Sequence, residues 1–260
     1  LYRTAPDRIS PLARRIFPEN SDISNDQSRQ IILAPIFAIL YAVLTCVLAF
    51  DWMMSIDQEW YSALFGFQYS MASIYAAGAF LMLVSAITRH RMNLADVLTA
   101  DTHNDLSRLV FASSLIWTYF IYSQILVIWY ANLPEETPYL ILRINSEPWS
   151  GIFQCLAISL FLIPFFGLLT KRACRSTFFS SIIAAIVLIG LWCEKYFLIV
   201  PSLLENRNSH GGATGISLNL WDITITIGIA AGFVLTFLYV LRHFPIVPIP
   251  DHLLHKPEQS

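Results

Sequence analysis

Residues 178–200 read FFSSIIAAIVLIGLWCEKYFLIV, an apolar run in which only Glu194 and Lys195 carry charge. A helix needs roughly 20 residues to cross about 30 Å of hydrocarbon, because it rises about 1.5 Å per residue. This run of 23 residues is long enough for that crossing. We therefore predict that it forms a transmembrane helix.

Five further apolar stretches surround this one and have similar lengths. They are Ile31–Phe50, Tyr61–Thr88, Leu109–Tyr130, Gly151–Leu169 and Leu220–Leu241. Hydrophobic residues make up 56% of the 260 residues and charged residues only 13%, against roughly 25% charged in an average soluble domain. The sequence therefore predicts an all-α integral membrane protein, with a bundle of six transmembrane helices over residues 31–243. A polar segment, residues 1–30, precedes the bundle, and a Pro-rich tail, residues 244–260, follows it.

The basic residues indicate the orientation of the six spans. Thirteen of the sixteen fall on one side: Arg3, Arg8, Arg14, Arg15, Arg29, Arg89, Arg91, Arg108, Lys171, Arg172, Arg175, Arg242 and Lys256. Arg143 and Arg207 fall in loops on the other side, and Lys195 lies within a span. Because cytoplasmic loops of membrane proteins carry the excess of Lys and Arg, both termini are expected in the cytoplasm.

No pattern for a redox centre or a metal site is present in the sequence. The four cysteines lie singly in or beside spans, without a C-x-x-C or C-x-x-C-H motif, and the six histidines fall in loops, at helix ends or in the tail. We expect no covalently bound cofactor and no metal ligands in this chain. The lipid bilayer is its expected surrounding, and nucleic acid is not an expected partner.

Glu194 is the leading candidate for a functional residue, because an ionisable side chain within the hydrocarbon is costly. It lies seven residues before Pro201, about 10 Å from the expected outer end of its helix. We predict a proton path through Glu194. Pairing with a neighbouring helix, or a snorkelling Lys195 that lowers the cost, is the simpler alternative.

Other polar residues extend this candidate proton path. Asp51 follows the first span directly, and Ser114, Thr118 and Tyr122 recur every four residues in the third span, with Gln124 beside them. These groups either hydrate a path for protons or bond to neighbouring helices. Asp51 can equally be an ordinary residue of the membrane interface.

An aromatic cluster near Asp51 is a candidate quinone pocket. It consists of Trp52, Trp60 and Tyr61, placed at the level where the first outer loop meets the membrane. An interfacial belt of aromatic residues explains the same cluster equally well.

Two segments resemble a known family. Residues 50–66, FDWMMSIDQEWYSALFG, and residues 129–137, WYANLPEET, look like the signature stretches of ActF, an NrfD-like subunit of alternative complex III. The tail segment 245–251, PIVPIPD, resembles the C-terminal pattern of that family, and Asp101, His103 and Asp105 lie where the family has a polar approach to the next helix. The resemblance runs through nearly the whole chain.

This resemblance implies a membrane subunit of a quinol:cytochrome c oxidoreductase in a bacterial cytoplasmic membrane, serving respiratory or photosynthetic electron transfer. The implied partners are a paralogous NrfD-like subunit, an iron–sulfur subunit and a multihaem cytochrome c subunit, which carry the iron–sulfur clusters and haem c. The subunit itself would hold at most a quinone or a lipid, anchor the complex and conduct protons. Asp51, Trp52, Glu135, Glu136 and Glu194 match the family pattern, but the match assigns them no roles.

One departure from the family is the number of spans. The family subunit has ten helices, so this chain resembles its C-terminal six. The first four helices are either absent from this chain or carried separately, and Leu1 is either a break or a true N-terminus. Two other functions stay open: a quinol-binding catalytic anchor that uses the aromatic cluster, and a structural scaffold whose acidic outer loops dock partner proteins.

Overall fold

The structure, a computed structural model, describes residues 23–57, 60–92, 100–208 and 220–243. Within these ranges the regular structure is helical and no strand occurs. Six helical segments are long and apolar enough to cross a membrane, as the sequence predicted. They are α2 (Ile23–Trp52), α3 (Ala63–Met92), α4 (Ala100–Ala131), α9 (Thr177–Asn208), α10 (Leu220–His243), and a composite of α6 (Trp149–Ala157), η4 (Ile158–Leu162) and α7 (Ile163–Leu168).

Two compact units make up the chain. Residues 36–215 form one unit, which contains most of α2 and every element from η3 to α9. Residues 1–35 and 216–260 form the other, whose described parts are the first residues of α2 and the whole of α10. All contacts described below lie within the unit formed by residues 36–215.

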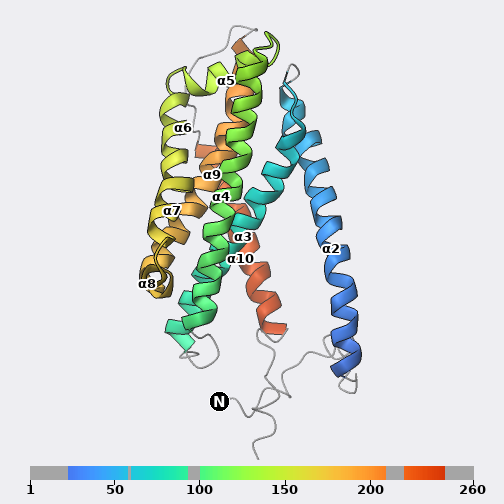
Figure 1. Cartoon of the computed structure of the whole chain (residues 1–260), viewed down its shortest axis with the longest axis vertical. Helices are drawn as coiled ribbons and strands as arrows, with labels where there is room; N and C mark the ends of the chain where they lie inside the picture. The colour runs from blue at the N-terminus through green and yellow to red at the C-terminus, as the bar shows by residue number, and fades with distance from the viewer. Residues whose placement is uncertain (1–22, 58–59, 93–99, 209–219, 244–260) are drawn as a thin grey trace, which may run out of the picture. The chain divides into compact units, whose positions relative to one another are not determined.

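The centre of this unit is built from α3, α4 and α9, with α6 and α7 packed beside α4 and α9 (Figure 1). Small and branched apolar side chains fill the space between these helices, including Ala79, Met82, Val110, Ala184 and Val187, all of which are buried. Close packing by small residues drives helix association in lipid, where hydrophobic burial contributes little.

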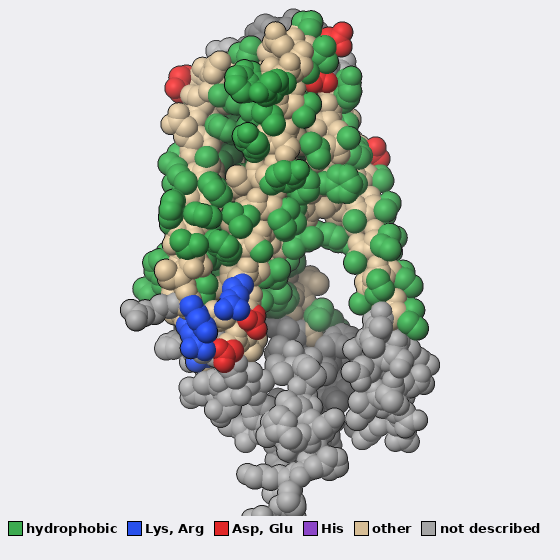
Figure 2. Space-filling model, in the orientation of Figure 1, with side chains coloured by type: hydrophobic (Ala, Val, Ile, Leu, Met, Phe, Trp, Pro, Cys, Tyr) green, Lys and Arg blue, Asp and Glu red, His purple; other side chains and the backbone are tan. Residues whose placement is uncertain are grey.

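Outward-facing side chains of the unit are mainly apolar, as expected for a surface in contact with lipid tails. Figure 2 shows green side chains along the flanks, with Lys and Arg gathered at one end of the face drawn. The basic residues there include Arg108, Lys171 and Arg175, which are exposed and lie close to two acidic groups. Arg175 pairs with Asp101 at 2.5 Å, and Arg108 lies 4.0 Å from Asp105.

The fourth span is irregular, and its sequence explains why. Pro164 has no N–H, so the carbonyl of Leu160 lacks the donor that an α-helix would supply from position 164. A π-helical turn, Ile158–Leu162, precedes the proline, and the buried Tyr75 hydroxyl of α3 donates to the Leu160 oxygen at 3.0 Å. An unpaired carbonyl is costly in lipid, so Tyr75 stabilises the irregular segment.

Two helix bounds differ from those expected, and one helix is additional. The helix α9 continues through Pro201 to Asn208, so Glu194 lies farther from the helix end than the sequence indicated. The additional short helix, α5 (Thr137–Ile144), lies between the third and fourth spans. The first helix already begins at Ile23, within the predicted polar segment. The tail segment 245–251 and residues 1–22 lie outside the described residues.

Candidate functional site

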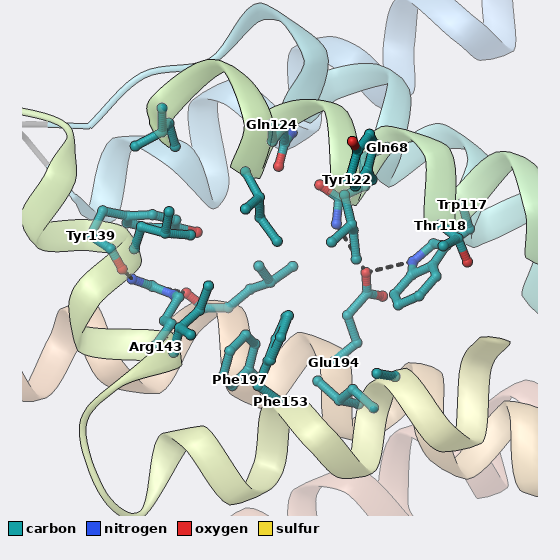
Figure 3. Close-up of a pocket in the computed structure, with 18 of the residues that line it drawn as sticks. Gln68, Trp117, Thr118, Tyr122, Gln124, Tyr139, Arg143, Phe153, Glu194 and Phe197 are labelled. Carbon is teal, nitrogen blue, oxygen red and sulfur yellow. Dashed lines mark hydrogen bonds between the residues drawn. The ribbon is translucent and has the colours of Figure 1, made fainter. Parts of the chain in front are cut away.

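A cavity of about 210 Å³ lies between α3, α4, α5, α6 and α9. Its walls are mainly aromatic and branched apolar side chains, and a few polar groups lie at separate places around them (Figure 3). Glu194, Gln68 and Trp117 group at one end, Tyr139 and Arg143 at the other, with Phe153 and Phe197 between them. Mostly apolar pockets with a few placed polar groups are typical of small-molecule sites.

Glu194 is buried, with 2% of its surface exposed, and it is held by side chains from two other helices. Its Oε1 accepts hydrogen bonds from Trp117 Nε1 of α4 at 2.9 Å and from Gln68 Nε2 of α3 at 3.2 Å. Its Oε2 forms an ion pair with Lys195 Nζ at 3.0 Å. Two hydrogen-bond donors and a cation thus contact the carboxylate and offset the cost of burying it.

Lys195 lies at the edge of this arrangement. About a third of its side chain is exposed, and its Nζ lies 4.5 Å from the centre of the Tyr69 ring. The sequence offered two readings of Glu194: a proton-carrying group, or an acid paired with neighbours. The structure shows the pairing, and it also places the carboxylate on the cavity wall.

The opposite end of the cavity is a stack of three groups. The rings of Trp60 and Tyr139 are parallel within 2°, with centres 3.8 Å apart, and the Arg143 guanidinium carbon lies 3.5 Å from the Tyr139 ring centre. Two planar groups at such similar distances cannot share one face of the ring, so Tyr139 lies between them. Burial raises the pKa of Tyr139 to about 12, although Arg143 acts in the opposite direction. The phenol is therefore neutral near pH 7.

Hydrogen bonds of Arg143 and Ser202 connect α5, α9 and Asp57. Its Nη1 donates to the Tyr139 carbonyl at 3.1 Å, and its Nη2 donates to the Leu198 carbonyl at 3.0 Å and to Ser202 Oγ at 2.8 Å. Ser202 in turn donates to Asp57 Oδ2 at 3.1 Å. This network fixes α5 against α9 and closes one end of the cavity.

The predicted proton-path residues fall into two groups. Thr118, Tyr122 and Gln124 line the same cavity as Glu194. Ser114 is buried one turn before Thr118, whereas Asp51 is exposed at the end of α2. The hydroxyls of Ser114 and Thr118 donate to carbonyls of their own helix, at 2.7 and 2.8 Å, rather than to neighbouring helices.

The predicted quinone-pocket residues separate in a similar way. Trp60 is buried and lines the cavity, whereas Trp52 and Tyr61 are 75% and 64% exposed. Gln68, Trp117, Tyr139 and Arg143 were not predicted. Arg143 alone had a signal in the sequence, since it is one of only two basic residues in the opposite-side loops.

Three polar atoms at the cavity have neither a hydrogen-bond partner nor an ion-pair partner among the residues that the structure describes. They are Trp60 Nε1, Gln68 Oε1 and Gln124 Nε2. Buried polar groups are rarely left without a partner, so water or a bound molecule with both donor and acceptor atoms would fit here. No group of three or more His, Cys, Asp or Glu side chains that could hold a metal ion occurs among the described residues.

No protein-family model matches this chain, and no curated protein matches it either.

Proposed function

We propose that this chain is a proton-conducting membrane subunit of a quinol:cytochrome c oxidoreductase of the alternative complex III type, similar to its NrfD-like subunit ActF. In this proposal the chain corresponds to the C-terminal six helices of that subunit, in a bacterial cytoplasmic membrane with both termini in the cytoplasm. Partner subunits carry the haem c and the iron–sulfur clusters. The buried carboxylate of Glu194, on the wall of a cavity inside a six-span membrane protein, is the observation that carries the proton role.

The positions of the two signature stretches support the resemblance. Residues 50–66 run from the end of α2 through η3 (Met54–Ile56) into α3, and residues 129–137 join α4 to α5. Side chains from and beside these stretches form a second buried cluster, with Trp60 and Phe65 packed around Ile128. From these stretches Trp60 lines the cavity, whereas Trp52, Tyr61, Trp129 and Tyr130 are exposed.

Proton conduction needs a carboxyl group that changes charge. The six apolar stretches contain two acidic residues, Glu194 and Asp222, and Asp222 lies at the start of the last stretch, so Glu194 is the acid farther from an end. Its carboxylate is contacted on both oxygens, by Trp117 and Gln68 at Oε1 and by Lys195 at Oε2, so these partners are in place to respond when a proton binds. Thr118, Tyr122 and Gln124 provide the polar wall along which water can reach it.

The test of this role is Glu194→Gln in the intact complex reconstituted in vesicles. Glutamine keeps the shape and the acceptor for Trp117 but cannot bind or release the proton. We expect unchanged assembly and a lower number of protons released per quinol oxidised. The matched control is Glu147→Gln, which removes an exposed acid that bonds Ser150. Unchanged proton release in Glu194→Gln would refute the role of this residue.

The complex itself has an independent test. A multihaem cytochrome c and an iron–sulfur protein should co-purify with the tagged chain from its native membrane after mild detergent extraction. A preparation that contains neither of them, at full yield of the tagged chain, would refute the proposed assembly.

Quinone binding is a second candidate function, favoured by the three unpartnered polar atoms around the cavity. A quinone ring is flat and apolar and carries two acceptor oxygens, which suit the donors Trp60 Nε1 and Gln124 Nε2. Binding of a quinone analogue that Trp60→Phe weakens, and Trp52→Phe does not, would support this candidate. Equal effects of the two substitutions would contradict it.

A further inference from the structure

A second buried polar cluster lies at the other end of the same three helices. His103 of α4 is buried, with 3% of its surface exposed. Its Nδ1 lies 3.1 Å from Ser85 Oγ of α3, and its Nε2 lies 2.6 Å from Ser180 Oγ of α9. The imidazole thus joins α3, α4 and α9, the same helices that supply Gln68, Trp117 and Glu194.

The hydrogen-bond partners of the His103 ring are compatible with two of its protonation states. Each serine hydroxyl has a single proton, and each also has a backbone acceptor: Ser85 donates to the Met82 carbonyl at 2.9 Å and Ser180 to the Ser176 carbonyl at 2.8 Å. When both hydroxyls donate to these carbonyls, both ring nitrogens must be donors, which is the imidazolium. When one hydroxyl turns toward the ring, the other nitrogen still donates and the imidazole is neutral.

Adding a proton to His103 therefore requires only the rotation of one hydroxyl. The proton arrives at the ring nitrogen that had accepted from a serine, and that serine then donates to its own helix carbonyl. No buried donor is left without an acceptor in either state, so the usual penalty for an unsatisfied buried group does not oppose the change. Ser85 is only partly buried, which gives the site an approach from the surface.

The charged groups near the ring are mixed in sign. Arg89 lies on α3 four residues after Ser85, and no carboxylate contacts the ring among the residues that the structure describes. The other charged or titratable side chains described at this end, on α4 and α8 (Lys171–Arg175), are Asp101, Asp105, Arg108, Lys171, Cys174 and Arg175. From α9, only the hydroxyl of Ser180 is recorded against the ring.

A mainly apolar layer separates this cluster from Glu194. Trp117 follows His103 by fourteen positions on α4, and Glu194 follows Ser180 by fourteen positions on α9, which corresponds to about 21 Å at about 1.5 Å per residue. Buried apolar side chains, including Ala79, Met82, Val110, Ala184 and Val187, fill most of this interval, together with the buried hydroxyls of Ser107, Ser113 and Ser114. The two polar clusters therefore serve opposite ends of the helices.

We propose that His103, held between Ser85 and Ser180, is a reversible proton-binding site at the Ala100 end of α4, open to the aqueous phase on that side. As the entry point of a path that leads toward Glu194, this role rests on the proposed function. Proton binding by the ring is a property of the site itself and can be measured separately.

The experiment is a pH titration of the intact purified protein labelled with [15N]histidine, followed by NMR of the ring nitrogens. The signal absent from His103→Gln is assigned to His103. We expect it to titrate reversibly between about pH 4 and 9, around the ordinary range of histidine. A ring signal that keeps one form throughout this range would overturn the proposal.

Ser85→Ala and Ser180→Ala test the hydroxyl arrangement. Each removes an acceptor of the charged ring, so the midpoint of the titration should fall by roughly one pH unit or more, a tenfold weakening of proton binding. Ser181→Ala is the matched control, because that hydroxyl bonds only the Thr177 carbonyl of its own helix. Equal midpoints in all three variants would also overturn the proposal.

The same titration separates this inference from the function proposed above. If His103 titrates as expected but Glu194→Gln leaves proton release unchanged, the site stands and the proposed path through Glu194 fails. If Glu194→Gln lowers proton release but His103 does not titrate, the path stands and has a different entry.

Discussion

The bond from Trp117 to Glu194 provides a direct test of whether this buried acid is ionised. In Trp117→Phe the indole donor, which lies 2.9 Å from Glu194 Oε1, is lost, while an aromatic ring of similar position is kept. A hydrogen bond to a charged group contributes about 1.5–3 kcal/mol to stability, whereas one between neutral groups contributes about 0.5–1.5 kcal/mol. The expected loss therefore depends on the charge of Glu194.

A double-mutant cycle separates that loss from the effect of the smaller ring. The variants are the parent, Trp117→Phe, Glu194→Gln and the double substitution, and the lost ring contacts are common to both arms of the cycle. Glu194→Gln keeps an acceptor oxygen for Trp117 but removes the charge. We expect Trp117→Phe to cost about 1 kcal/mol more in the parent than in Glu194→Gln, from the difference between charged and neutral bonds.

Equilibrium unfolding in mixed micelles with an increasing fraction of a denaturing detergent measures the four free energies of unfolding. Circular dichroism confirms that each variant starts from the same helix content. An equal cost of Trp117→Phe in both backgrounds would refute an ionised Glu194 bonded to Trp117. In that case, proton conduction by Glu194 would have to start from the protonated, neutral side chain.

Two further predictions concern pH and packing. Since the pKa of Tyr139 is raised to about 12, the folded protein keeps this proton between about pH 10 and 12 while the unfolded chain loses it. The free energy of unfolding should therefore fall over that range by up to about 1.4 kcal/mol per pH unit, and Tyr139→Phe should abolish this part of the slope in a pH series of unfolding measurements. Gly190→Ala would place a Cβ 2.8 Å from Leu160 Cδ2, so we expect it to destabilise the protein by about 1–3 kcal/mol in thermal unfolding. Gly151→Ala meets nothing within 4 Å and should be neutral or slightly stabilising; equal effects of the two glycine substitutions would contradict the close contact.

The six spans and the buried position of Glu194 were predictable because each depends on local composition. A run of 20 or more apolar residues has few alternatives to a membrane helix, and one acid in such a run is conspicuous. Helix ends were less predictable. Pro201 lies inside α9 without ending it, and Arg143, a partner far away in the sequence, donates to the Leu198 carbonyl three residues before the proline.

The composition of the cavity could not be predicted, because it depends on which faces of separate helices meet. Nothing in the sequence distinguishes Gln68 and Trp117 from other residues of their spans. Packing of the helices places both side chains against Glu194. The predicted cluster of Trp52, Trp60 and Tyr61 does not form a single pocket, for a different reason. Trp60 and Tyr61 precede α3, where no helical period fixes side-chain direction, so Trp60 turns inward while Tyr61 is exposed; Trp52, the last residue of α2, is exposed as well.

The arrangement of the two polar clusters constrains how any proton could pass between them. At a separation of about 21 Å, the charges of His103 and Glu194 interact by less than about 1 kcal/mol at an effective dielectric constant of 20. A change in the charge of one residue therefore has little effect on the charge of the other. A path must instead cross the apolar layer, where the Tyr75 hydroxyl is a buried polar group beside Ser114. That hydroxyl already donates to the Leu160 carbonyl, which Pro164 leaves without a helical donor. Its rotation would expose an unsatisfied carbonyl at a cost of about 1–3 kcal/mol, so the layer stays closed unless water enters to replace the bond.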